Sequence, residues 1–221
     1  MNSLIDQFFN LTVMQEALPY LLKGLLITIG LTVVLAPLGM IAGLALALGS
    51  NPRNPFLRIV VRSWINVFRA MPPLVLIILA FSALPFIGIH LPAFACVVVA
   101  LLLNNSSYYC EIFRAGLGSV GPGQLEAARS TGLGTWDAMR FVVLPQATRN
   151  VLPDLASNTI EVMKATSLAA IVAVNEMLYV AGTIRSVTYN TSPLTLAAII
   201  YLAILLPAVR LTGRLERKPL L

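Results

Sequence analysis

The sequence predicts an all-α protein that crosses a membrane about five times and carries one long polar loop. Of its 221 residues, 58% are hydrophobic and only 11% are charged, whereas soluble domains carry about 25% charged residues. The apolar residues form long runs, and the mean hydropathy is +0.86. Lysine and arginine gather in alternate loops, as expected of a membrane protein with several spans. These observations exclude a soluble domain as the main body of the chain.

Five apolar segments can cross a bilayer, which takes ~20 residues within a working range of about 17–25. The second, third and fifth segments are near the short end of that range. The fourth is the least apolar, because Asp154, Glu161 and Lys164 fall within it. We expect a single membrane domain over residues 1–221, with spans at about 21–48, 72–89, 92–109, 151–174 and 194–209.

The distribution of basic residues predicts the orientation of the spans. Only Lys23 and Arg185 fall on one side, and Lys164 falls inside the fourth span. The N-terminus is therefore expected outside and the C-terminus in the cytoplasm. The pI of about 9.7 then reflects topology and contact with anionic membrane lipid, so nucleic-acid binding is not required. The other basic residues lie in three stretches: Arg53, Arg58, Arg62 and Arg69; Arg114, Arg129, Arg140 and Arg149; Arg210, Arg214, Arg217 and Lys218.

The longest polar stretch, residues 114–149, has the pattern of two short helices joined by a glycine turn. The first helix is expected to start near Gln124, after a Gly-Pro-Gly breaker, and to end at Gly132. Glu126 and Arg129 are three residues apart and can pair on its surface.

The second short helix is expected over Trp136–Leu144. Thr135 is its predicted N-cap, and Pro145 is expected to close or kink it. The small residues at the turn allow another surface to approach closely. From these residues alone, two interpretations stay open: a loop that folds back and seals the bundle, or a docking element for a partner.

A motif in this loop resembles the EAA loop of ABC importer permeases. In that family the loop forms a coupling helix that sits in a cleft of the ATPase subunit. The resemblance implies a coupling loop over about 119–147 in a bacterial inner-membrane protein, with Glu126, Ala127, Ala128 and Gly132 at the ATPase. The matching residues are Glu126-Ala127-Ala128, Gly132 and Leu144-Pro145-Gln146-Ala147.

Flanking motifs are similar to those of the polar-amino-acid branch of these permeases, the histidine, glutamine and arginine type. The resemblance extends from about Leu18 to the C-terminal tail. One departure is Ala165, where many relatives have an acidic residue. The flanking motifs are Phe68-Arg69-Ala70-Met71-Pro72, the run from Tyr109 to Gly116, and Lys164-Ala165-Thr166-Ser167-Leu168.

The chain is expected to bind no nucleotide itself. It contains no Gly-Lys dipeptide, so it has no phosphate-binding loop of the G-x-x-x-x-G-K-[ST] type. The family implies an ABC ATPase dimer that binds ATP and Mg²⁺, a second permease that is a copy or a paralogue, and an extracytoplasmic amino-acid-binding protein. No catalytic or metal site is predicted, because the only histidine, His90, lies in a short apolar turn.

Polar residues in the fourth span are the candidates for a substrate pathway. Charged groups at this depth are costly and are treated as functional candidates. Glu161 and Lys164 are three residues apart and can pair, so a neutralising ion pair that faces the bundle interior is one interpretation. In the other, Glu161 binds a substrate ammonium, and Lys164 or an arginine elsewhere binds a carboxylate. The full candidate set is Asn158, Glu161, Lys164, Thr166 and Ser167.

At the cytoplasmic end of the third span, Glu111 and Arg114 are also three residues apart. Together with Arg69 they are predicted to form a gate or a structural brace at that mouth of the bundle.

The predicted function is the translocation subunit of an ABC importer for a polar amino acid, with no covalent catalysis by this chain. Basic, acidic and amide amino acids and related compounds such as opines all fit a polar pathway. Two other classes stay open: a small ATP-independent secondary transporter or channel, and a membrane anchor or exporter subunit without import activity. The absence of a clear internal repeat argues against the first of these.

Overall fold

The computed structural model describes residues 2–50 and 55–216, and in these ranges the regular structure is entirely helical. The all-α prediction is confirmed. Arg53, Arg217 and Lys218, three of the residues behind the predicted orientation, lie outside the described residues. The elements are α1 (Asn2–Phe8), α2 (Leu11–Gly49), α3 (Pro55–Ala70), α4 (Pro73–Ala83), η1 (Leu84–Ile87), α5 (Ala93–Ser119), α6 (Pro122–Ser130), α7 (Thr135–Ala138), η2 (Met139–Val143), α8 (Leu144–Asn150), α9 (Leu152–Ala165), η3 (Thr166–Val172), α10 (Met177–Thr188) and α11 (Ser192–Glu216).

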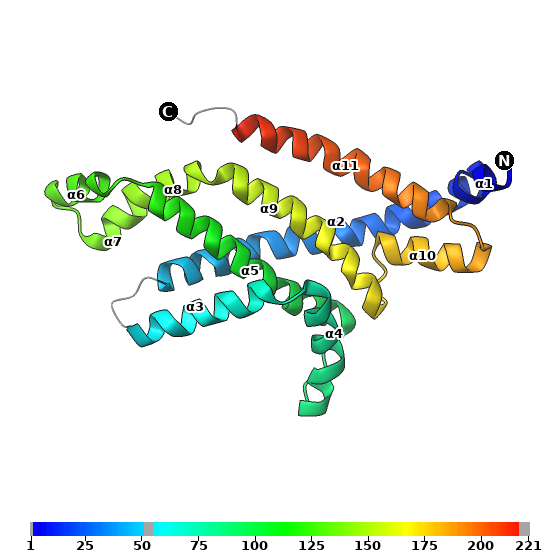
Figure 1. The fold of residues 1–221 in the computed structure, drawn as a ribbon, viewed down its shortest axis with the longest axis horizontal. Coiled ribbons are helices and arrows are strands. Elements are labelled where there is room, and N and C mark those ends of the chain that lie inside the picture. The colour runs from blue at the N-terminus through cyan, green and yellow to red at the C-terminus, as the bar shows by residue number, and fades with distance from the viewer. Residues whose placement is uncertain (1, 51–54, 217–221) are drawn as a thin grey trace.

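The helices form an elongated bundle in which α2, α3, α5, α9 and α11 run roughly along the long axis (Figure 1). The short helices α6 and α7 lie at one end, and α1 and α10 lie at the other. α11 runs from the α1 end back toward the other end of this axis (Figure 1). This arrangement separates the polar loop from the N-terminal end by the whole length of the bundle.

The core is built on the packing of α2 against α5. Gly39 and Gly43 of α2 face Tyr109, which has no exposed surface. A Cβ atom at Gly43 would lie 2.6 Å from Tyr109 Cβ and 2.8 Å from the Cys110 amide nitrogen. The two backbones therefore approach as closely as glycine allows. Small residues at such crossings are typical of membrane helices, whose association depends on close packing.

Three helices or fused helices in the described ranges are long and apolar enough to cross a membrane, and the number rises to five if each of two bent pairs counts as one span. One bent pair joins α3 to α4 and η1 at 100°, and the other joins α9 and η3 to α10 at 45°. The first bend falls at Pro72 and Pro73, whose missing N–H groups interrupt the helix ladder.

Several helices extend beyond the apolar segments that the sequence marks. α2 begins ten residues before the predicted span at 21–48, and α5 continues ten residues past the predicted end at residue 109. At 1.5 Å per residue, α2 is about 58 Å long, so it is longer than a ~30 Å hydrocarbon core. A helix does not end where its hydrophobicity ends, because its backbone hydrogen bonds continue into the polar region.

A buried polar junction joins α2, α10 and α11 at the end opposite the polar loop. Glu176 has no exposed surface and caps α10, accepting hydrogen bonds from the amides of Leu178 at 2.8 Å and Tyr179 at 2.6 Å. The Tyr201 hydroxyl of α11 donates to the same carboxyl group at 3.4 Å. The backbone of Met177 packs against Gly24 of α2, where an added Cβ would lie 2.8 Å from Met177 Cα.

Candidate functional site

The first half of the polar loop forms a helix that ends at a left-handed glycine. α6 spans Pro122–Ser130, so it begins two residues before the predicted start. Gly132 has φ +88°, a conformation that is costly for residues with a side chain. The amides of Gly132 and Leu133 donate to the carbonyls of Arg129 at 3.0 Å and Ala128 at 3.4 Å, which satisfies the end of the helix. The predicted glycine stop is therefore present.

The second half differs from the predicted single helix in two respects. The N-cap of α7 is Gly134, and Thr135 is the first helical residue, without a side-chain capping bond. The helix also continues past Pro145, because the preceding residues Met139–Val143 adopt the wider π-helical register. In that register the missing N–H of Pro145 is tolerated, so the helix does not end at this proline.

The two halves are held to the bundle by backbone contact and side-chain hydrogen bonds. A Cβ atom at Gly116 of α5 would lie 2.7 Å from the Ala147 carbonyl oxygen of α8. The Asn150 amide donates to the Ser119 hydroxyl at 2.8 Å, and the Gln146 amide donates to Gln124 at 3.3 Å. The loop is therefore fixed to the end of α5 and does not hang free.

The predicted coupling residues divide between the outer and inner sides of this unit. Glu126, Ala127 and Gly132 are exposed, whereas Ala128 is buried beneath them. Trp136 is 76% exposed, so only a small part of it packs on the described bundle. Glu126 and Arg129 do not pair, since the ion pairs among the described residues leave both of them out. The unit thus presents small residues and one large aromatic side chain outward.

The candidate pathway residues lie on different sides of α9 and η3. Glu161 and Lys164 form an ion pair, with 63% and 49% of their side chains exposed. The pair therefore lies on the outside of the chain, and the interpretation that it faces the bundle interior is wrong. Thr166 is fully buried, and its hydroxyl donates to the Met163 carbonyl at 2.7 Å. Ser167 likewise donates within its own helix, to Lys164.

Asn158 lies one helical turn before Glu161. Its Nδ2 atom is the buried side-chain nitrogen or oxygen that lacks a hydrogen-bond partner among the described residues. A buried donor without a partner is costly. The chain itself covers this amide, so the exposed polar surface of α9 is formed by the Glu161–Lys164 pair.

Glu111 of α5 pairs with Arg114 of the same helix and lies near Arg69 of α3. Its carboxyl oxygens lie 2.7 Å from Arg114 Nη1 and 3.9 Å from Arg69 Nη1, and the three side chains are between 30% and 49% exposed. The structure thus brings together the three residues of the predicted gate or brace.

Two further residues hold the bend between α3 and α4. Pro72 and Pro73 cannot donate to the carbonyls of Phe68 and Arg69, four residues earlier. The Asn104 amide donates to the Phe68 carbonyl at 2.8 Å, and the Tyr108 hydroxyl donates to the Arg69 carbonyl at 3.2 Å. The sequence feature that could have pointed to Asn104 and Tyr108 is the Pro-Pro pair. It leaves two backbone carbonyls without their helical donors, so side chains must supply these hydrogen bonds.

In the described part of the chain, no group of three or more His, Cys, Asp and Glu residues could hold a metal ion. Cys96 and Cys110 are free and buried. His90 is exposed, and its ring nitrogen lies 3.3 Å from the Gly88 carbonyl.

Comparison with known proteins gives one consistent family. Residues 36–220 match the family described as binding-protein-dependent transport system inner membrane component. The chain is 35% identical over 215 residues to the "Probable amino-acid ABC transporter permease protein YckA" of Bacillus subtilis (strain 168), covering 96% of this chain and 95% of that one. It is 32% identical to the arginine transport system permease protein ArtQ of the same organism, covering 95% and 96%.

A solved structure agrees with these relatives. The crystal structure of an amino acid ABC transporter with histidines superimposes with a TM-score of 0.84 at 36% identity, over 92% of this chain and 96% of that chain. An inward-facing structure of the MetNI methionine ABC transporter shares the fold, with a TM-score of 0.70 at 20% identity. The loop, the bent helices and these matches together show that the chain belongs to the family of binding-protein-dependent transport system inner membrane components, the permeases of ABC transporters.

Proposed function

We propose that this chain is the translocation subunit of an importer for a polar amino acid, driven by a separate ABC ATPase dimer. The observation that carries the proposal is the loop unit of α6, Gly132 and α7, which is exposed at one end of the bundle and fixed to α5 and α8. A docking element needs both properties, because a partner must reach it and its movement must be transmitted. The names of the relatives, which include permeases for arginine and glutamine, support the amino-acid class.

The arginines near the loop support the orientation that we propose for the bundle. The loop end, with Arg129, Arg140 and Arg149, faces the cytoplasm and the ATPase, and the N-terminus lies outside. ATP and Mg²⁺ bind to the ATPase, and the α1–α10 end faces an extracytoplasmic binding protein. Glu126, Ala127, Ala128 and Gly132 form the coupling site.

The polar face of α9 lines the substrate pathway. Glu161 and Lys164 are exposed on the single chain, and charged groups that face lipid are costly. A second permease, either a copy or a paralogue, would cover this face and enclose a polar path. Glu161 would bind the ammonium of a zwitterionic substrate and Lys164 its carboxylate, with Asn158 as an additional donor. Thr166 and Ser167 shape the helix around the path, since their hydroxyls already bond to it.

The cluster of Arg69, Glu111 and Arg114 acts as a gate or brace at the cytoplasmic mouth. It ties the bent α3–α4 pair to α5, the helix that also carries the loop through Gly116. Closure of the ATPase dimer would move the loop and α5 together. The transport cycle is then an equilibrium between two arrangements of the bundle, and both ATP and the binding protein bias it.

Co-purification of the tagged chain with its ATPase from mild detergent tests the proposal. Wild type should retain the ATPase, and Gly132→Asp should lose it, because φ +88° disfavours any side chain and the added charge would stand in the proposed docking surface. Gly134→Asp is the matched control: it adds the same charge two residues away, at a helix N-cap with φ −63° that favours aspartate. A folded wild-type chain that retains no ATPase would favour the ATP-independent transporter or the anchor.

A further inference from the structure

We propose that the cytoplasmic end of the bundle binds the phosphate headgroup of an anionic phospholipid between Arg62 of α3 and Arg114 of α5. The assignment of this site to the cytoplasmic side of the membrane rests on the orientation proposed above. The binding itself is independent of transport. In this site two guanidinium groups hold the phosphate anion, and apolar side chains contact the attached glycerol and acyl chains.

A cavity of ≈ 480 Å³ carries both arginines on its wall. This volume lies within the range of about 300–1,000 Å³ that is typical of small-molecule sites. Most of the remaining wall is apolar or glycine, including Leu117 at the end of α5 and Val143 beside the loop. A second hollow of ≈ 270 Å³ also has Arg62 and Arg114 on its wall. The two arginines thus border adjacent open spaces.

The charges around this cavity do not cancel. Glu111 is shared by Arg114 and Arg69. Arg62 forms no ion pair or hydrogen bond with any of the described residues. Of the charged residues that line the two cavities, Arg62 and Arg114 therefore face the single carboxylate of Glu111, which leaves an excess of positive charge next to an apolar wall. Arginine binds phosphate oxygens through two parallel hydrogen bonds, and a partly desolvated site strengthens each bond.

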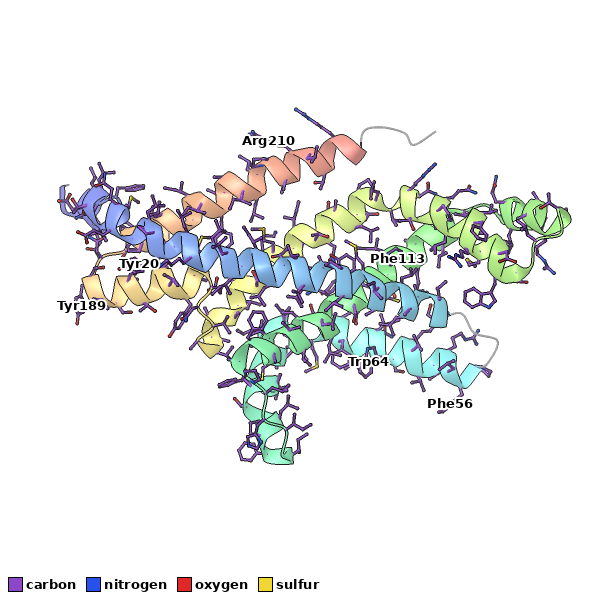
Figure 2. The ribbon with its side chains drawn as sticks, turned by 180° about the vertical axis from the view of Figure 1, so that it is seen from behind. Tyr20, Phe56, Trp64, Phe113, Tyr189 and Arg210 are labelled. Carbon is purple, nitrogen blue, oxygen red and sulfur yellow. The ribbon has the colours of Figure 1, made fainter. Side chains whose placement is uncertain are left out.

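The two faces of α3 indicate that the anion comes from a lipid. Arg58, Arg62 and Arg69 recur at spacings that place them along one side of the helix. Ile59, Val60 and Val67 are apolar and between 46% and 61% exposed. Phe56 and Trp64 are marked on the same helix, which runs along one edge of the bundle (Figure 2). Because α3 runs along the bundle axis, these exposed apolar side chains would lie beside acyl chains, while Arg62 and Arg114, next to the loop residues Pro122 and Leu125, would lie at the depth of the headgroups.

Native mass spectrometry of the full-length chain tests the site. The chain is purified from membranes with any subunits that co-purify and exchanged into detergent with phosphatidylglycerol or phosphatidylcholine. Wild type should retain phosphatidylglycerol over phosphatidylcholine, and Arg62→Gln should bind it about tenfold more weakly, since one charge-assisted contact is lost. Arg58→Gln is the matched control. Arg58 lies one helical turn before Arg62 and carries the same charge, but it does not line the cavity. The variant should behave as wild type.

Three results would overturn the proposal. Equal phosphatidylglycerol retention by wild type and Arg62→Gln would show that Arg62 holds no headgroup. Inorganic phosphate that displaces the retained lipid at millimolar concentration would make this a free-anion site. Displacement by the transported amino acid, lost in Arg62→Gln, would assign the cavity to the substrate exit. None of these outcomes depends on whether the loop binds the ATPase, so a failure here is distinguishable from a failure of the proposed function.

Discussion

Tyr109 of α5 and Thr159 of α9 share a hydrogen bond of 2.9 Å at a point where Tyr109 has no exposed surface. The Thr159 hydroxyl also lies 2.8 Å from the Leu155 carbonyl, to which it donates. Three core helices meet here, because Gly39 and Gly43 of α2 pack on the tyrosine ring and its Cβ atom.

Tyr109→Phe is expected to lower the free energy of unfolding by about 0.5–1.5 kcal/mol, the net contribution of one hydrogen bond. The loss is limited because Thr159 keeps its bond to Leu155. Thermal unfolding of the purified complex measures the change. A double-mutant cycle with Thr159→Val should show coupling between the two residues. Additive effects would mean that the hydrogen bond contributes nothing.

Gly43→Ala is expected to destabilise the bundle by about 1–3 kcal/mol, because the added Cβ overlaps the backbone of α5. Gly30→Ala in the same helix has no atom within 4 Å of the added Cβ. It should leave stability unchanged or raise it slightly, as alanine favours helix more than glycine does. Thermal unfolding of the two variants side by side measures the difference. Equal effects of the two substitutions would contradict the close packing of α2 on α5.

Asn104→Ala is expected to cost about 1–3 kcal/mol, because it leaves the carbonyl groups at the α3–α4 bend without their donor. Asn105→Ala is the control. The Asn105 amide donates to the Leu101 carbonyl of the same helix, and the backbone hydrogen bonds of that helix remain in the variant. The ratio of folded to aggregated protein after heating in detergent compares the two variants. An Asn104→Ala variant as stable as wild type would show that the bend does not need this side-chain donor.

Glu161→Gln is expected to reduce transport about tenfold or more while the ATPase still co-purifies, because one charged contact to the substrate is lost. Uptake of radiolabelled amino acid into proteoliposomes measures the effect. Asp154→Asn, which removes a charge from the first turn of the same helix, should leave uptake near wild type. A Glu161→Ala complex that transports at the wild-type rate would end the assignment of Glu161 to the substrate.

Local rules of chain geometry made the helical fold and the glycine turn predictable. The run of apolar segments requires helices in a bilayer, and Gly132 ends α6 as its position after the helix indicates. The continuation of the helix through Pro145 was not predictable, because a π-helical turn before a proline depends on the packing of Val143 and Ala147 against the bundle.

The exposure of Glu161 and Lys164 was beyond the reach of the sequence for a different reason. The spacing of these residues predicts that they pair, and they do. The side of α9 that meets the bundle is decided by Leu155 and Val162, which are buried against other helices. Helical spacing fixes which residues share a face, but only the packing of the other helices decides where that face points.

The two ends of the bundle differ in how the solvent can act on them. The contacts of Glu176 and Met177 are sheltered from water, so dissolved ions cannot screen them. The contacts of Glu111 with its arginines are roughly one-third to one-half exposed, so they weaken as ionic strength rises. The salt concentration of the surrounding solution therefore changes the strength of the contacts around Glu111 and leaves the contacts around Glu176 unchanged.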